Sequence, residues 1–146
     1  MTGFPVSSLV PPPGPDERIR EWWAATERRE LLVQRCQACR AAQHYPRAVC
    51  TNCGATGLVF EVGSGEATLY SYTTVFRSPH RDFEAPYVIA LVRLAEGPLV
   101  LSRVVGTAEE TLRCDQALIL AWEVLEDGRA LPVFTVPARD RAGTDA

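Results

Sequence analysis

Two patterns of hydrophobic and polar positions divide the chain into an N-terminal helical segment and a longer β-rich segment. In residues 15–30, four side chains recur at intervals of three or four positions and so share one helix face: Ile19, Trp22, Trp23 and Thr26. From residue 66 to residue 76 the side chains alternate with a period of two, which is typical of a strand with two usable faces. The chain is therefore predicted to be mainly β, with an N-terminal helix over residues 15–30.

Five runs in the second half of the chain predict five strands. They span residues 66–76, 87–94, 99–105, 117–124 and 130–136. Residues 107–112 have the pattern of one or two helical turns between the third and fourth strands. This order of elements is that of an OB-fold, so residues 58–137 are predicted to form a five-stranded OB-fold barrel. Four large aromatic side chains are expected in its core: Phe60, Phe76, Trp122 and Phe134.

The two ends of the chain are polar or rich in proline. Residues 10–15 read Val-Pro-Pro-Pro-Gly-Pro and cannot be helical, so residues 1–14 are predicted to form a flexible, proline-rich arm. Residues 1–10 have neither the basic start nor the long apolar core of a signal peptide, so the expected location is cytoplasmic. Residues 138–146 are polar and are predicted to form a frayed tail.

The two adjacent tryptophans of the predicted helix allow two interpretations. Trp22 and Trp23 either pack on the body of this chain, as large aromatic residues commonly do, or form a docking element for a partner protein. Tryptophan is enriched among the residues that contribute most to binding energy at interfaces. Partner binding by this pair is therefore one prediction of the sequence.

Two Cys-x-x-Cys motifs separated by ten residues are the strongest chemical signal in the chain. They consist of Cys36, Cys39, Cys50 and Cys53. Short β-like runs at residues 31–35 and 43–47 surround the first motif and precede the second, so residues 31–57 are predicted to form a rubredoxin-like zinc ribbon. Four thiolates match the tetrahedral preference of Zn²⁺, and one structural zinc ion is the expected cofactor, with iron as the main alternative. Gly54 is suited to the left-handed turn that closes such a motif, whereas the corresponding position after the first motif is Arg40.

The other uses of paired cysteines fit less well. Without a secretory segment, disulfides are not expected, and a redox-active pair usually opens a helix, for which residues after Cys39 show no pattern. Four protein sulfurs fill the coordination shell, so the metal is expected to hold the fold together and to do no chemistry. The fifth cysteine, Cys114, is expected to be a small buried apolar residue.

Composition and charge narrow the classes of function. The chain is 47% hydrophobic and 23% charged, which is ordinary for a globular protein, and no apolar run approaches the ~20 residues of a membrane span. Residues 1–57 carry seven arginines and five acids (net +2), and residues 58–146 carry eight arginines and thirteen acids (net −5). Nucleic-acid binding, the alternative use of zinc ribbons and OB-folds, requires a basic groove, which an acidic barrel does not provide.

Several arginines gather near the ribbon. Arg35, Arg40 and Arg47 either form a solvated face or meet phosphates, such as those of coenzyme A. His44 lies near the cysteines, but a complete set of four sulfurs favours a packing or surface role for it.

Several short segments together resemble one protein family. The segments are Trp22-Trp23, Gln34-Arg35-Cys36-x-x-Cys39, Tyr45-Pro46-Arg47-x-x-Cys50-x-x-Cys53-Gly54, Gly65-x-Ala67-Thr68-Leu69-Tyr70-Ser71-Tyr72-Thr73, Pro86-Tyr87-Val88-Ile89-Ala90-Leu91-Val92 and Leu131-Pro132-Val133-Phe134. Across residues 18–136 the chain resembles the acyl-CoA-associated zinc-ribbon and OB-fold proteins long described as a domain of unknown function. It departs from them at Arg40, where a glycine is more common.

The resemblance implies a non-catalytic partner of thiolase-superfamily enzymes. Members accompany thiolases, lipid-transfer-protein-like aldolases of steroid side-chain degradation, or hydratases, and meet acyl-CoA through the partner. The residues agree with this role, because a thiolase needs a nucleophilic cysteine beside a histidine base, and neither His44 nor His80 is near Cys114 in the sequence. We therefore expect an accessory subunit of a hetero-oligomeric acyl-CoA-processing complex, with no catalytic residue of its own.

Overall fold

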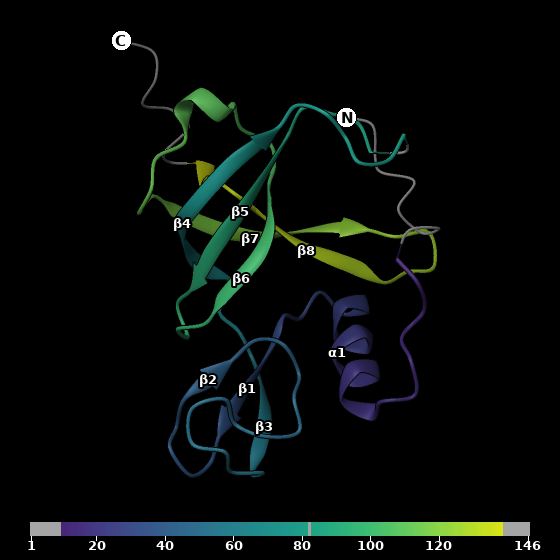
Figure 1. Cartoon of the computed structure of the whole chain (residues 1–146), viewed down its shortest axis with the longest axis vertical. Coiled ribbons are helices and arrows are strands. Elements are labelled where there is room, and N and C mark those ends of the chain that lie inside the picture. Colours follow the sequence, from purple (N-terminus) through teal and green to yellow (C-terminus); the bar gives the residue numbers. More distant parts are fainter. Residues whose placement is uncertain (1–9, 82, 139–146) are drawn as a thin grey trace.

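The computed structural model describes residues 10–81 and 83–138 and shows a helix, a small sheet and a closed barrel. Figure 1 shows helix α1 and strands β1 to β3 together at one end of the molecule, next to the barrel formed by the later strands. The predicted mainly β fold, with an N-terminal helix, a ribbon and a five-stranded barrel, is confirmed. In the described part of the chain, no helix combines the length and the apolar character needed to cross a membrane.

Helix α1 (Glu17–Glu27) is bounded by a side-chain cap and a left-handed turn. The carboxylate of Asp16 accepts a hydrogen bond from the backbone N–H of Arg18 at 2.9 Å, which satisfies one of the free amides of the first turn. After the helix, Arg29 has a φ of 61°, a conformation common just past helix ends. The helix is thus shorter than the predicted span of residues 15–30, because the cap and the turn occupy its outer positions.

The ribbon sheet contains three antiparallel strands in the order β2-β1-β3. Strand β1 (Leu32–Cys36) lies between β2 (Ala42–Gln43) and β3 (Leu58–Val62). The predicted boundary at residue 58 assigns β3 to the barrel, but the structure pairs β3 with β1 over five residues. Pairing with β3 satisfies the edge of β1 that β2 does not cover. Strand β2 is also shorter than the predicted strand at residues 43–47, which contains a proline that cannot donate to a ladder.

The barrel closes in the order β4-β5-β6-β8-β7, with β4 also paired to β7. Its strands are β4 (Glu66–Val75), β5 (Tyr87–Leu94), β6 (Leu99–Val104), β7 (Ala117–Val124) and β8 (Ala130–Thr135). A short 3₁₀ turn, Glu109–Thr111, lies between β6 and β7, where the sequence predicts helical turns. Strands β6 and β8 pair in parallel at Val104 and Phe134, and the hydroxyl of Ser102 in β6 donates to the carbonyl of Pro132 in β8 at 2.7 Å.

One hydrophobic core connects the barrel to the ribbon. Along β5, every second side chain is buried, as the period-two pattern predicts: Val88, Ala90, Val92 and Leu94. Leu31 and Val33, at the start of the ribbon, belong to the same buried cluster as these barrel residues. Because core packing is dense and specific, this shared cluster fixes the ribbon against the barrel.

For three residues the expected place in the barrel core is wrong. Phe134 is fully buried and Trp122 packs against the core, as expected, but Phe76 follows the last residue of β4 and is 76% exposed. Phe60 lies in β3 and so belongs to the ribbon sheet. Cys114 is exposed, because the fully buried Leu112 takes the inward position in the segment before β7.

Helix α1 is held against the barrel by the buried residue Thr26. Its hydroxyl accepts a hydrogen bond from the backbone N–H of Ala130 in β8 at 3.2 Å and donates one to the carbonyl of Trp23 at 2.6 Å. The hydroxyl therefore satisfies a backbone donor that the barrel buries beneath the helix.

A second contact between distant parts of the chain is made by Arg129. This buried guanidinium donates to the carbonyls of Val10 and Pro11 at 2.8 and 2.9 Å and lies 4.8 Å from the centre of the Trp23 ring. The described part of the predicted arm is thus tied to the loop between β7 and β8. Residues 1–9 of the arm and 139–146 of the predicted tail lie outside the described residues.

We predict that Thr26→Val lowers the free energy of unfolding by about 1–3 kcal/mol, because it leaves the buried N–H of Ala130 without an acceptor. The matched variant Thr26→Ser retains the hydroxyl and should lose much less stability. Urea unfolding of the zinc-loaded variants measures both values. Equal losses for the two variants would show that the hydroxyl does not secure the helix.

Candidate metal centre and adjoining cavity

The four predicted metal ligands come together in the ribbon. The sulfur atoms of Cys36, Cys39, Cys50 and Cys53 all lie within 4.8 Å of one another. Cys36 Sγ is 3.7 Å from Cys53 Sγ, and Cys39 Sγ is 3.6 Å from Cys50 Sγ. A tetrahedral zinc ion with bonds of about 2.3 Å has sulfur–sulfur edges of about 3.8 Å. The arrangement therefore fits one zinc ion with a complete shell of protein sulfurs.

The two cysteine motifs close by the same backbone geometry. The N–H of Arg40 donates to the carbonyl of Cys36, and the N–H of Gly54 donates to the carbonyl of Cys50, both at 2.9 Å. Gly54 has a φ of 77°, as the sequence suggests, and Arg40 adopts the same left-handed region with a φ of 65°. The first motif thus closes without glycine because an arginine takes a backbone conformation that side chains usually disfavour.

A nearby asparagine favours the thiolate state that a metal ligand needs. The side-chain amide of Asn52 donates to Cys39 Sγ at 3.4 Å, and its backbone N–H donates to Cys50 Sγ at the same distance. The hydrogen bond from the Asn52 side chain is the main reason that the pKa of Cys39 is lowered to about 6. Asn52 therefore supports the metal site from outside the ligand set.

Two buried glutamines, whose role the sequence does not reveal, hold the second cysteine motif in place. Gln34 Oε1 accepts hydrogen bonds from the Gln43 side chain at 2.8 Å and from the backbone N–H of Arg47 at 2.9 Å. Gln43 Oε1 in turn accepts from the backbone N–H of Thr51 at 2.9 Å. In the sequence, these residues are only two glutamines in short β-like runs, and such a pattern does not reveal that their side chains are buried.

The three arginines predicted to meet phosphates have different surroundings. The guanidinium of Arg35 pairs with Glu61 at 3.2 Å and donates to the carbonyl of Arg40 at 2.9 Å. Arg40 and Arg47 are exposed residues of the ribbon loops. Contact between these arginines and a ligand phosphate stays a prediction.

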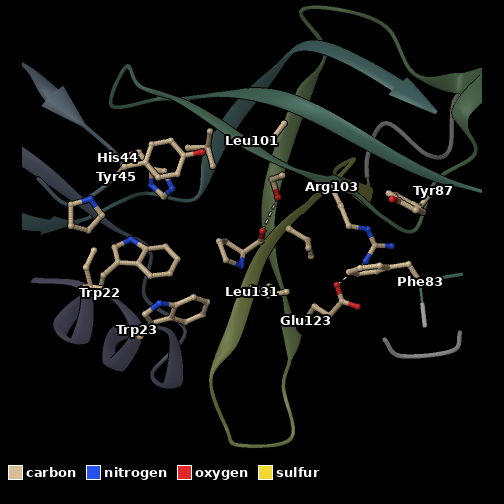
Figure 2. A pocket seen from close by; sticks show the side chains of 16 residues that line it. Trp22, Trp23, His44, Tyr45, Phe83, Tyr87, Leu101, Arg103, Glu123 and Leu131 are labelled. Carbon is tan, nitrogen blue, oxygen red and sulfur yellow. Dashed lines mark hydrogen bonds and ion pairs between the residues drawn. The ribbon is translucent and has the colours of Figure 1, made fainter. Parts of the chain in front are cut away.

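A cavity of about 410 Å³ lies between the helix and ribbon on one side and the barrel on the other. Figure 2 shows Trp22, Trp23, His44 and Tyr45 on the first side. Barrel residues line the opposite side, including Tyr87, Leu101, Arg103, Glu123 and Leu131. The cavity is thus built from segments that lie far apart in the sequence.

Both tryptophans are only partly exposed and contribute to this cavity. The Trp22 indole N–H donates to the carbonyl of Leu32 at 3.2 Å, and its ring packs against the core. The Trp22 and Trp23 rings meet edge to face, with centroids 5.0 Å apart. Packing on the chain's own body thus accounts for much of their surface, and their contact with a partner protein stays a prediction.

Two family models match the chain over neighbouring stretches. One, described as the ChsH2 rubredoxin-like zinc ribbon domain, matches residues 23–59, and the other, the ChsH2 C-terminal OB-fold domain, matches residues 62–123. A DUF35 domain-containing scaffold protein from Methanothermobacter thermautotrophicus is 30% identical over 116 residues, which cover 77% of this chain and 86% of the relative. The chain belongs to the DUF35 family.

Other relatives include both short and long proteins. A DUF35 domain-containing scaffold protein from Methanocaldococcus jannaschii is 34% identical over 95 residues, covering 63% of this chain and 67% of the relative. A protein from Thermomonospora curvata, described as a probable enoyl-CoA hydratase alpha subunit, is 34% identical over 127 residues. That match covers 87% of this DUF35 chain but only 40% of the longer protein.

Solved structures agree with this assignment. A chain from a solved structure described as an Ltp2-ChsH2(DUF35) aldolase superposes with a TM-score of 0.76 at 33% identity, covering 86% of this chain and 98% of that chain. A DUF35 protein of unknown function from Sulfolobus solfataricus superposes with a TM-score of 0.62 at 14% identity, which shows the same fold. The zinc ribbon and OB-fold inferred from the sequence are therefore confirmed for this DUF35 protein.

Loss of one metal ligand should disrupt the ribbon. We predict that Cys36→Ser no longer retains one zinc per chain and loses a large part of the roughly 10 kcal/mol that a structural zinc contributes. Elemental analysis after dialysis and thermal unfolding measure the two effects. Cys114→Ser, which changes the exposed cysteine outside the ribbon, is the matched control and should keep both zinc and stability. A zinc-free Cys36→Ser protein with an unchanged melting temperature would contradict a structural role for the metal.

Burial of His44 should make the folded state sensitive to acid. The pKa of His44 is lowered from 6.5 to about 4 because burial excludes water from the ring. Between these values the unfolded chain binds a proton at His44 and the folded chain does not, so stability falls as the pH falls from 6.5 to 4. His44→Phe should reduce this loss by up to roughly 3 kcal/mol.

Urea unfolding across this pH range, with zinc in excess, measures the effect of His44. Ile119→Phe, at a half-exposed position of β7, changes no ionisable group; it is the control and should run parallel to the wild-type curve. Zinc loss in acid affects all three proteins, so the difference between the curves reports His44. Parallel curves for His44→Phe and the wild type would show that the ring titrates alike in both states.

Proposed function

We propose that this chain is a non-catalytic accessory subunit that binds and supports a thiolase-superfamily partner, either a thiolase or a lipid-transfer-protein-like aldolase, in acyl-CoA metabolism. The observation that carries the proposal is the match to the DUF35 chain of the Ltp2-ChsH2 aldolase, which extends over 98% of that chain. Two archaeal relatives described as DUF35 scaffold proteins support a role in assembly. Degradation of fatty-acid or steroid side chains is the expected setting.

The chemistry of the described residues supports a role without catalysis. A structural zinc with four cysteine ligands leaves no coordination position for water or substrate. The cysteine outside this site, Cys114, precedes β7, whereas His44 follows β2 in the ribbon and His80 lies in the loop between β4 and β5. A nucleophile paired with a histidine base, as thiolase chemistry requires, is therefore expected on the partner.

Exposed apolar side chains on two parts of the surface support contact with a partner. Tyr45 and Val49, in the ribbon loop, are 50% and 46% exposed, and Phe76 and Val124, on the barrel, are 76% and 58% exposed. Apolar residues that cluster at a surface commonly mark interaction sites. In this proposal the ribbon and helix bind the partner, and the barrel covers the entrance through which acyl-CoA reaches the partner's active site. An acyl-CoA hydratase is a second expected partner, which the match within a longer hydratase subunit supports.

Purification of the full chain from its native extract tests the proposal most simply. A thiolase-superfamily protein should co-purify in a fixed ratio, and that protein should convert its acyl-CoA at least tenfold faster with this chain than without it. The zinc-loaded chain alone should show no turnover. A monodisperse chain that binds no thiolase relative, or a partner equally active without it, would overturn the proposal.

A charge-reversal pair tests the contact with coenzyme A within the same complex. Arg47→Glu should keep the partner bound but raise its KM for acyl-CoA about tenfold, because charge-assisted hydrogen bonds to phosphate are among the stronger ones. Arg77→Glu, at an exposed position just after β4, is the matched control and should leave the KM unchanged. Equal KM values for the two variants would place the coenzyme A phosphates away from the ribbon.

A further inference from the structure

The cavity between the helix, the ribbon and the barrel has the size of a small-molecule site. Its volume of about 410 Å³ lies within the range of about 300–1,000 Å³ that is usual for such sites. Residues of both β6 and β8 line it, including Ser102 and Pro132, which are joined by a hydrogen bond of 2.7 Å. Barrel strands therefore form one side of the cavity, and the ribbon and helix α1 form the other.

Apolar groups form most of the wall. Aromatic rings from α1 and from the ribbon loop face the aliphatic side chains of Leu101 and Leu131 across the cavity (Figure 2). A hydrocarbon ligand would remove these surfaces from water, which is the main source of affinity in such sites. The lining therefore selects a mainly hydrocarbon molecule.

The opposite charges of Arg103 and Glu123 in the cavity lining neutralise each other. Arg103 Nη1 and Glu123 Oε2 are 2.9 Å apart, and both side chains are largely buried. A further ionisable side chain on the wall, His44, is neutral at pH 7, because burial lowers its pKa to about 4. A wall without net charge offers no compensation for a buried ionic group, so it favours a neutral ligand.

His44 provides a polar group that the protein itself leaves unpaired. Its ring is part of the cavity wall and only 6% exposed, and in the described part of the chain Nδ1 has no hydrogen-bond partner. Buried polar atoms in proteins nearly always have a partner. A neutral imidazole has one donor nitrogen and one acceptor nitrogen, and its two tautomers exchange these roles between Nδ1 and Nε2. A hydroxyl group can pair with either nitrogen, since it both donates and accepts.

We propose that this cavity binds a small, neutral, mainly hydrocarbon molecule whose single hydroxyl group hydrogen-bonds to His44. The edge-to-face rings of Trp22 and Trp23 hold the hydrocarbon part, and the unpaired imidazole selects the hydroxyl. The site lies within this chain and does not depend on the proposed partner. Failure of the ligand test would therefore leave the accessory-subunit proposal standing. Failure to find a partner enzyme would likewise leave the ligand proposal standing.

The test compares 2-naphthol with naphthalene, which has the same ring system without the hydroxyl. Each is titrated into the ¹⁵N-labelled, zinc-loaded full chain, and the indole N–H signals of Trp22 and Trp23 are followed by NMR. Both compounds should bind saturably, with 2-naphthol about fivefold tighter because of one additional hydrogen bond. No saturable shift at these signals, or equal affinities for the two compounds, would overturn the proposal.

Two variants and one direct measurement locate the site. His44→Phe should weaken 2-naphthol to the affinity of naphthalene, and Leu131→Trp should abolish binding of both by filling the cavity. Ile119→Trp, at a half-exposed position of β7 outside the cavity lining, is the matched control and should bind normally. If a cavity variant fails to fold, the ring nitrogen signals of His44 in the wild type decide: they should shift with 2-naphthol and stay in place with naphthalene. Unmoved signals with both compounds would overturn the proposal.

Discussion

The constraint on which the rest of the structure depends is the convergence of four cysteine sulfurs on one tetrahedral position. The ribbon contains only short strands, and β2 is two residues long, so its sheet alone offers little stabilisation. The sulfurs of Cys36 and Cys39 lie close to those of Cys53 and Cys50, which ties two separate loops together. A zinc ion in this position supplies the free energy that a small apolar core cannot.

The effect of the metal extends beyond the ribbon because ribbon and barrel share a core. Leu31 and Val33 lie in the same buried cluster as the inward residues of β5, and β3 leads directly from the ribbon into the barrel. Ordering of the ribbon also positions His44 and Tyr45, which form one wall of the cavity. A metal without a free coordination position can in this way shape both a proposed partner surface and a proposed ligand site.

The sequence predicts those parts of the fold that local patterns determine. Cysteine spacing identifies the metal ligands, and period-two alternation identifies the barrel strands. It does not show which strand completes the ribbon, because the apolar run of β3 fits either sheet and its partner β1 lies more than twenty residues away. The sequence also predicts, wrongly, that Phe76 and Cys114 are buried in the core, since side-chain type alone does not reveal where a strand ends. The cavity depends on contacts between α1, the ribbon and the barrel, for which no local pattern exists.

Hydrogen exchange before and after removal of zinc with a chelator tests the central claim most directly. The account predicts that amides of β1 and β3 and the indole N–H of Trp22, which is bonded to the carbonyl of Leu32, lose most of their protection. The amides between β4 and β5, which pair over the length of both strands, should retain more of theirs. Unchanged protection throughout the ribbon of the metal-free protein would contradict the claim that four sulfurs and one ion hold this end of the molecule together.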